Sequence, residues 1–337
     1  MARITIKRLW ATFLLPAAIS VLVSACTKPN LVSTAPENNY DTPTPVGTPN
    51  SSSTAYITTL GSVTNPAGIA VDAAGYVYVA DSNNSVIRVV SPGGQVSTLA
   101  GGSGALFSDP IGVAVDQYGT VYVADAGNNE ILKISGGVAS IFAGQPGSGT
   151  SFSFPAGVAV DSAGFVFVAD CYNSMIREIS PGGTVTTLAG QAGSPGAVNG
   201  STSSATFWGP YGVAVDNYGN VYVGDSYNNM IRKISGGWIS TLAGSGTPGS
   251  SNGFGSNASF STPEGVAVDG SGNVYVADFA TNLIRKITSG GDVSTLAGPS
   301  NSTVSATFNN PVGVAVDGYG HVFVGDSGDN EVREIFP

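Results

Sequence analysis

One motif constrains the fold of this chain more than any other feature, because it occurs six times. The fourth copy reads GVAVDNYGNVYVGD and begins at Gly212. The other copies begin at Gly68, Gly112, Gly157, Gly265 and Gly313. Successive copies are 44 to 55 residues apart. A repeat of this period is typical of solenoids and propellers, in which each unit buries its apolar face against the next unit.

Each repeat predicts four short strands, as the fourth copy shows. Residues 213–215 are apolar and lead through an Asp-x-x-Gly hairpin into the alternating residues 221–223. A polar turn precedes a third strand at 230–234, and two glycines precede a fourth strand, WISTLAG. The chain contains 47 glycines, which fits short strands joined by tight turns rather than helices. Four antiparallel strands per repeat make one propeller blade.

The last repeat has only three strands before Pro337. The fourth is predicted from the other end of the chain, where ITTLG from Ile57 matches VTTLAG from Val185. Pairing of that strand with the last repeat would remove an exposed sheet edge. We therefore predict an all-β, six-bladed β-propeller of four-stranded blades at residues 54–337, closed by the N-terminal strand completing the C-terminal blade.

The repeated pattern P-x-G-V-A-V-D, V-Y-V-A-D, N-x-I-R-K-I and T-L-A-G, which runs through residues 65–337, resembles the NHL repeat family. The resemblance implies a β-propeller. It does not choose a function, since this fold hosts lyases, lactonase-like hydrolases, RNA-binding proteins and extracellular sensor or adhesion modules.

The N-terminal segment predicts export. A basic start precedes an apolar stretch of 17 residues, 9–25, which is shorter than the ~20 residues that span a bilayer as a helix. Residues 1–25 are therefore predicted to be a signal peptide. The sequence VSAC, which ends at Cys26, resembles the lipobox of bacterial lipoproteins, and this resemblance implies that Cys26 carries a lipid. An ordinary secretory signal is the alternative.

Residues 26–53 are predicted to be a flexible tether, because they are rich in Pro, Thr, Ser and Asn and almost devoid of aliphatic side chains. The expected location is the cell envelope, extracytoplasmic and lipid-anchored to a membrane. The direction of the closing strand places the junction with the tether on the face opposite the loops between blades. Those loops would then point away from the membrane.

Two aspartates occur in every repeat, so neither can mark a single site. The first opens a hairpin, where its carboxylate can accept hydrogen bonds from the turn. This set is Asp72, Asp116, Asp161, Asp216, Asp269 and Asp317. The second ends the second strand, and in five blades an arginine seven residues later is its expected partner. This set is Asp81, Asp125, Asp170, Asp225, Asp278 and Asp326.

Two side chains of the repeat extend this structural interpretation. Blade two has Leu132 in place of the arginine, which leaves Lys133 as the nearest alternative partner for Asp125. The phenylalanine before each first strand, such as Phe207, is expected to pack between blades. The lone Cys171 is expected to be a packing residue.

Composition argues against two function classes. From Thr54 onward the chain has 8 basic and 20 acidic residues, a net charge of −12, which disfavours nucleic acid as a partner. The resemblance includes lyases that hold zinc with several histidines, but the one histidine, His321, lies in a first hairpin, opposite the expected binding mouth. Neither a Cys/His cluster nor a Gly-x-Ser-x-Gly motif is present. We predict no metal and no cofactor, and a carboxylate and amide metal site is the alternative.

Residues that the repeats do not share point to the mouth of the central channel. At the middle position of Pro-x-Gly, four blades carry Ala, Ile or Val, whereas adjacent blades four and five carry Tyr211 and Glu264. Aromatic residues on nearby turns and loops could complete a shelf for a sugar or a peptide, and ordinary loop packing is the alternative. These residues are Tyr172, Tyr227, Phe279 and Trp208. The long loops before blades four and five are expected to join this face.

The sequence thus favours a monomeric, surface-tethered, extracytoplasmic propeller that binds a protein, peptide or glycan without catalysing a reaction. The alternative is a metal-dependent lyase or lactonase-like hydrolase with its site at the mouth of the central channel. Metal analysis of the purified domain would separate the two.

Overall fold

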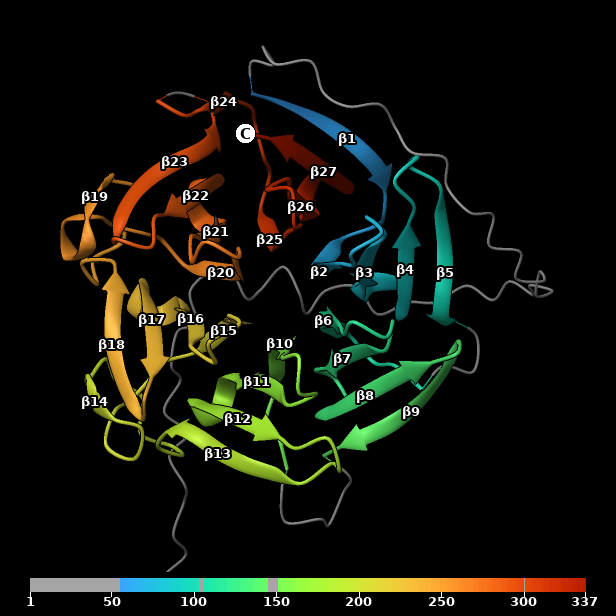
Figure 1. The fold of residues 1–337 in the computed structure, drawn as a ribbon, viewed down its shortest axis with the longest axis horizontal. Coiled ribbons are helices and arrows are strands. Elements are labelled where there is room, and N and C mark those ends of the chain that lie inside the picture. The colour runs from blue at the N-terminus through green and yellow to red at the C-terminus, as the bar shows by residue number, and fades with distance from the viewer. Residues whose placement is uncertain (1–54, 103–105, 145–150, 300) are drawn as a thin grey trace, which may run out of the picture. The chain divides into compact units, whose positions relative to one another are not determined.

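The structure is a computed structural model that describes residues 55–102, 106–144, 151–299 and 301–337. These residues form six sheets, each built on four antiparallel strands, around a central axis (Figure 1), which confirms the predicted six-bladed propeller. The predicted signal peptide, Cys26 and the predicted tether lie outside the described residues. No helix within the described part of the chain is long and apolar enough to cross a membrane.

Each blade consists of four strands, which follow one another from the channel outward. Blade one is β2 (Pro66–Val71), β3 (Val77–Asp81), β4 (Val86–Val90) and β5 (Val96–Gly101). Blade two is β6 (Pro110–Val115), β7 (Val121–Asp125), β8 (Glu130–Ser135) and β9 (Val138–Ala143). Blade three is β10 (Pro155–Val160), β11 (Val166–Asp170), β12 (Met175–Ile179) and β13 (Val185–Gly190).

The remaining blades have the same order. Blade four is β15 (Pro210–Val215), β16 (Val221–Asp225), β17 (Met230–Ser235) and β18 (Trp238–Ala243). Blade five is β20 (Pro263–Val268), β21 (Val274–Asp278), β22 (Leu283–Ile287) and β23 (Asp292–Gly298). Blade six is β25 (Pro311–Val316), β26 (Val322–Asp326), β27 (Glu331–Phe336) and β1 (Tyr56–Ser62).

Blade six confirms the predicted closure. Strand β1 pairs antiparallel with β27, from Tyr56 opposite Phe336 to Ser62 opposite Glu331. The rings of Tyr56 and Phe336 stack with their centroids 4.5 Å apart. The first strand that the structure describes therefore completes the last blade (Figure 1), and an apolar cluster joins blades six and one.

Strand register defines two faces of the ring. Each inner strand begins opposite the end of the second strand, as Pro210 does opposite Asp225. We call this end of the blades the site face and the other end, which bears the first hairpins, the hairpin face. Because β27 begins beside Asp326 and ends at Phe336, the start of β1 lies on the hairpin face.

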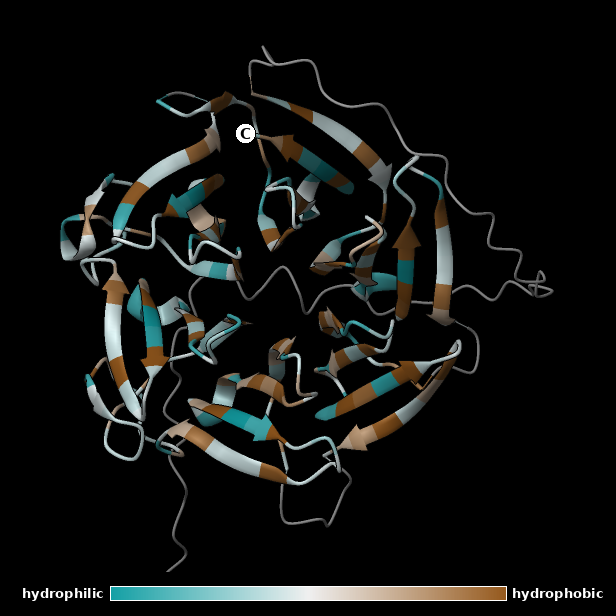
Figure 2. Ribbon diagram, in the orientation of Figure 1, coloured by the Kyte–Doolittle hydropathy of each residue, from teal (hydrophilic) through white to brown (hydrophobic). Residues whose placement is uncertain are grey.

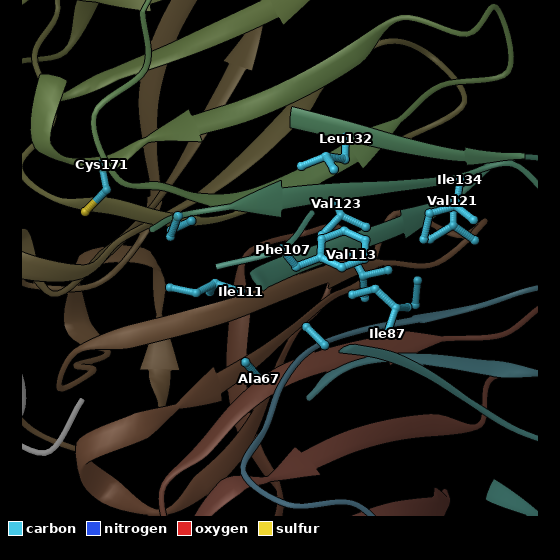
Figure 3. Close-up of a cluster of buried hydrophobic side chains, with 14 residues drawn as sticks. Ala67, Ile87, Phe107, Ile111, Val113, Val121, Val123, Leu132, Ile134 and Cys171 are labelled. Atoms are coloured by element: carbon cyan, nitrogen blue, oxygen red, sulfur yellow. The ribbon is translucent and has the colours of Figure 1, made fainter. Parts of the chain in front are cut away.

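The core consists of apolar layers between neighbouring blades. Hydrophobic residues follow the inner and second strands, while the third strands carry a polar band (Figure 2). Between blades one and two, Phe107 lies among Ile87, Val123 and Leu132 (Figure 3). Phe207 packs in the same way between blades three and four. The recurring phenylalanine is therefore an inter-blade packing residue, as predicted.

The inner strands of adjacent blades approach closely at one glycine each. A Cβ atom on any of these glycines would lie 2.0–2.4 Å from the carbonyl oxygen of the Pro-x-Gly middle residue in the next blade. The six glycines are Gly68, Gly112, Gly157, Gly212, Gly265 and Gly313. Such contacts admit no side chain, because real Cβ atoms do not approach an oxygen this closely. The contact from Gly313 to Ala67 closes the ring.

Both sets of repeated aspartates have structural partners. In the first set, one carboxylate oxygen accepts backbone N–H groups two and four residues later at 2.8–3.0 Å in all six blades. In the second set, five aspartates pair with the predicted arginines at 2.7–3.2 Å. Four of these guanidinium groups also lie over the inter-blade phenylalanine, 5.1–5.6 Å from its centroid. The repeated residues are scaffold.

Asp125 in blade two is the exception. Its carboxylate is fully buried and accepts hydrogen bonds from the Ser108 amide at 2.7 Å and from the Asn128 side chain at 2.8 Å. The suggested partner Lys133 is wrong, because its ammonium group lies 5.8 Å from the ring centroids of Tyr122 and Phe142 instead. Burial therefore raises the pKa of Asp125 to about 6.

This buried acid predicts a pH-dependent stability. Asp125 binds a proton more tightly in the folded state, so its stabilising contribution is present below the unfolded pKa of about 4 and is lost as the pH rises through 6. The free energy of unfolding of the Asp125→Asn variant, relative to the native chain, should be about 2 kcal/mol higher at pH 7.5 than at pH 4.5. Urea unfolding at both pH values measures this. If the variant and the native chain differ by the same free energy of unfolding at both pH values, the raised pKa of Asp125 is contradicted.

Candidate functional site

The middle residues of Pro-x-Gly form a ring at the site face of the channel, which we call the mouth ring. Ala67, Ile111 and Ala156 are buried in one apolar cluster, against which Tyr211 and Val312 pack. Glu264 completes the ring and is its one charged member. Below the ring, a cavity of about 210 Å³ is lined by apolar residues of the six inner strands, such as Val213, Ala214 and Val215. The side chains that line this cavity are therefore apolar, and the polar side chains Tyr211 and Glu264 belong to the mouth ring.

Glu264 is the second residue of β20 and is only partly exposed. Its carboxyl group makes no hydrogen bond or ion pair with any residue that the structure describes. Burial without a compensating partner raises the pKa of Glu264 to about 8. At neutral pH this carboxyl group is thus mostly protonated, and it is the acid at the mouth whose ionisation a ligand could change.

Tyr211 lies in the adjacent blade, at the matching position of β15. Its pKa is raised well above 10, first by burial and then by the nearby Glu264 carboxylate. Within the described residues, the phenol has no hydrogen-bond partner. The two residues singled out by comparing repeats are therefore neighbours, and each has a polar group at the mouth ring without a hydrogen-bond partner among the described residues.

Aromatic residues of the site face border the mouth ring, and we call them the rim. Tyr172 is in η3 (Cys171–Asn173) and stacks on Phe154 with centroids 4.7 Å apart. Tyr227 is in η4 (Ser226–Asn228) and meets the Trp208 ring edge-on at 5.9 Å. Both tyrosine amides donate to the preceding loop at 3.1 Å, to the carbonyls of Ser153 and Trp208. The rim thus consists of two ring pairs held by backbone hydrogen bonds.

Phe279 does not join these pairs. It lies half-buried in η6 (Phe279–Thr281) on the same face of blade five, and no ring contact links it to another described aromatic residue. Of the six predicted site residues, Tyr211 therefore lies beside Glu264. Tyr172 and Tyr227 belong to the two ring pairs of the rim, and Trp208 joins through its contact with Tyr227. Phe279 stands apart.

Phe154 is a site residue that the sequence reasoning missed. It has a φ of +53°, a conformation that is strained for a bulky side chain. The residue before the proline has a positive φ in all six blades, and the other five are Asn65, Asp109, Gly209, Thr262 and Asn310. Mostly these are Asn, Asp or Gly, which tolerate that conformation. The sequence signal that could have identified Phe154 is an aromatic residue at a repeat position that mostly carries Asn, Asp or Gly.

Several ionisable groups lie within electrostatic range of one another at the mouth. The pKa of Tyr227 is raised by burial and then by Cys171, Tyr172 and Glu264. Burial also raises the pKa of the Cys171 thiol to about 12, so the cysteine is a packing residue, as predicted. Burial raises the pKa of Asp109 as well. Each of these ionisable groups near Glu264 is an acid, a phenol or a thiol.

The side chains that most often bind metals form no metal-binding cluster among the described residues. No group of three or more His, Cys, Asp or Glu residues there could hold a metal ion. His321 lies in the first hairpin of blade six, as predicted, with Nδ1 at 3.1 Å from Asp317 and 3.5 Å from Glu334. It belongs to the hairpin face and not to the mouth.

The long loops before blades four and five were predicted to join the binding face, but the structure places their middle segments elsewhere. Their middle segments form β14 (Gly200–Ser201) and β19 (Gly253–Phe254), which pair with the starts of the outer strands β18 and β23. Those starts belong to the hairpin end of the blade.

Buried arginines hold these loops in place. Arg232 donates to Asn199 Oδ1 at 2.7 Å and to the Val198 carbonyl at 3.1 Å. Arg285 binds Asn252 Oδ1 at 2.8 Å and the Ser251 carbonyl at 3.0 Å. The arginines thus fix these middle segments on the outer strands, whereas Gly196 and the loop end at Trp208 contact the η4 turn of the site face.

The NHL repeat family matches residues 64–90, 107–134, 152–178 and 260–287, which fall in four of the six blades. This chain is an NHL-repeat β-propeller. Over 80 residues, the propeller is 40% identical to the Arabidopsis thaliana protein SUPPRESSOR OF QUENCHING 1, chloroplastic. That match spans 23% of this chain and 8% of the plant protein.

Solved structures share the fold of this NHL-repeat propeller at low identity. A Bacteroides thetaiotaomicron protein of unknown function has a TM-score of 0.68 at 23% identity, covering 83% of this chain and 75% of that one. An auxiliary nutrient binding protein from the same organism has a TM-score of 0.64 at 16% identity, covering 82% and 69%. A streptogramin B lyase has a TM-score of 0.60 at 14% identity, covering 84% and 97%. At these identities the likeness concerns the fold alone.

Proposed function

We propose that this NHL-repeat propeller is a non-enzymatic binding module that takes a protein, peptide or glycan at its site face. The observation that carries the proposal is the pair Glu264 and Tyr211, whose polar groups lack partners among the described residues. An unpaired polar group in a poorly solvated place is costly, and a ligand that satisfies it recovers that cost. The exposed aromatic side chains of Tyr172 and Trp208, which belong to the rim, supply apolar contact area.

The surface-tethered part of the proposal is supported by the sequence before residue 54 and by the position of β1. The start of β1 lies on the hairpin face, so a tether that joins there would leave the site face free to point outward. Replacing Cys26 by serine should move the protein from the membrane fraction to the soluble extracytoplasmic fraction. Unchanged fractionation would remove lipid anchoring from the proposal.

Binding is tested with the purified propeller on peptide and glycan arrays. Ligands of the native chain should lose most of their signal with the Tyr211→Ser and Glu264→Gln variants, because these remove the groups that the ligand satisfies. Tyr218→Ser is the matched control, since Tyr218 is a tyrosine of the hairpin face with 88% exposure. Ligands that respond to Tyr218 and not to Tyr211 or Glu264 would overturn the proposed site.

Catalysis by a lyase or lactonase-like hydrolase is the second candidate, favoured by one observation. A carboxyl group with a pKa of about 8 can donate or accept a proton near neutral pH. The fold is shared with a streptogramin B lyase. No group of three or more His, Cys, Asp or Glu among the described residues could hold a metal ion, and Glu264 is the group that would transfer the proton. Turnover of a bound array ligand that is lost in Glu264→Gln would favour this candidate over simple binding.

A further inference from the structure

The distribution of positive charge in the propeller is uneven. From Thr54 onward the chain has eight basic residues, and all of them lie on third strands. They are Arg88, Lys133, Arg177, Arg232, Lys233, Arg285, Lys286 and Arg333. A first and a second strand separate each third strand from the channel axis (Figure 1). No basic side chain therefore belongs to the mouth ring or to the rim.

These cations also have partners already. The five arginines pair with the aspartates that end the second strands. The three lysines lie over tyrosine rings of the second strands, 5.2–5.8 Å from the ring centroids. Turning one of them toward the mouth would break such a contact. The propeller itself therefore supplies no cation to pair with the Glu264 carboxylate.

We propose that the site selects an organic cation, a protonated amine or a quaternary ammonium group, presented by the peptide or glycan that binds there. This inference rests on the proposed function and specifies its ligand. The Glu264 carboxylate would be the counter-ion. The faces of Tyr211, Tyr172 and Tyr227 would supply the aromatic surface that attracts such cations.

The surroundings of Glu264 favour a cation over a neutral or anionic ligand. The ionisable groups that face it are Tyr211 from β15, Tyr227 from η4 and Cys171 from η3, and none of them is positive. A neutral hydroxyl group could form a hydrogen bond with the Glu264 carboxyl group but would bring no charge to balance the carboxylate when that group is ionised. An anionic ligand would find no basic side chain at the mouth and would be repelled by Glu264 whenever its carboxyl group is ionised.

The test uses choline and its neutral isostere 3,3-dimethylbutan-1-ol as probes, with binding measured by ligand-observed NMR on the full propeller. Choline should bind at least about tenfold more tightly than the neutral probe, because only choline forms the ion pair and the cation–π contacts. Glu264→Gln should weaken choline binding about tenfold and leave the neutral probe unchanged. Tyr218→Ser on the hairpin face should change neither affinity. Thermal melting of each variant verifies that it is folded.

A pH series provides a second readout that a purely structural role of Glu264 would not give. The charge of choline does not titrate, whereas the Glu264 carboxyl must lose its proton to pair with the probe. Choline affinity should therefore rise about tenfold in all between pH 6 and pH 9, the same factor that Glu264→Gln removes, and level off above the pKa of about 8. The Glu264→Gln variant should show a flat profile.

Two outcomes overturn the inference. The first is equal affinity of the native chain for choline and its isostere, and the second is choline binding that is unchanged in Glu264→Gln. If array ligands still depend on Glu264 and Tyr211 in either case, only the cation selectivity is wrong and the binding function stands. If no array ligand depends on these residues, the proposed function itself fails.

Discussion

Deletion of residues 55–62 should lower the free energy of unfolding by about 3–5 kcal/mol, because β1 stabilises both interfaces of blade six. Ile57 packs in the apolar layer between blades five and six, and Leu60 packs in the layer between blades six and one. The deletion also removes the ladder with β27 and the stacking of Tyr56 on Phe336. Since domains are stable by only about 5–15 kcal/mol, the loss should be visible as a large drop in Tm.

Three controls make this result interpretable. Deletion of residues 30–50, within the predicted tether, should leave Tm unchanged. The single substitution Ile57→Ser should cost about 1–2 kcal/mol and reports on the same interface if the larger deletion does not fold. A synthetic peptide of residues 55–62 should raise the Tm of the deletion variant in a concentration-dependent manner, by mass action. Equal Tm values for the two deletions would mean that β1 does not hold the ring closed.

The fold could be predicted from the sequence because the six repeats act as independent copies of one pattern. Alternation of side chains fixed the strands, and the missing fourth strand of the last blade identified its replacement near Ile57. The arginine seven residues after each second-strand aspartate gave the ion pairs, since strand pairing places the two residues together. Lys133 was wrongly suggested because spacing does not show that its neighbours Tyr122 and Phe142 offer a closer contact.

The candidate site was predictable only where it departs from the repeat. Tyr211 and Glu264 are visible because four other blades carry small or aliphatic residues at that position. Phe154 could not be found in this way, since the sequence shows neither its positive φ nor the stacking of its ring on Tyr172.

The loops before blades four and five were misplaced for a related reason. Length and composition do not reveal that Arg232 and Arg285 bind Asn199 and Asn252 across more than 30 residues of sequence. Both asparagines precede a glycine at the start of a short strand, and this shared Asn-Gly was the one sequence sign of a common structure.

Gly212→Ala should destabilise the propeller by about 3 kcal/mol or more, at the upper end of what overpacking usually costs. The new methyl group would lie 2.0 Å from the Glu264 carbonyl oxygen and 2.9 Å from the Val266 nitrogen. Both atoms belong to the backbone of β20, so no side chain can move aside, and blades four and five must separate. Gly270→Ala is the matched control, because nothing lies within 4 Å of its Cβ position. Urea unfolding should show no loss for this control.

The same substitution also tests whether the ring of glycines positions the site. Gly313→Ala creates an equivalent clash, 2.3 Å from the Ala67 carbonyl oxygen, but between blades six and one. The two variants should lose similar stability, since the contacts are alike. Only Gly212→Ala displaces Glu264 relative to Tyr211, so at a temperature where both variants are folded it alone should weaken binding of a Glu264-dependent ligand. Equal binding by the two variants would show that the spacing of blades four and five does not govern the site.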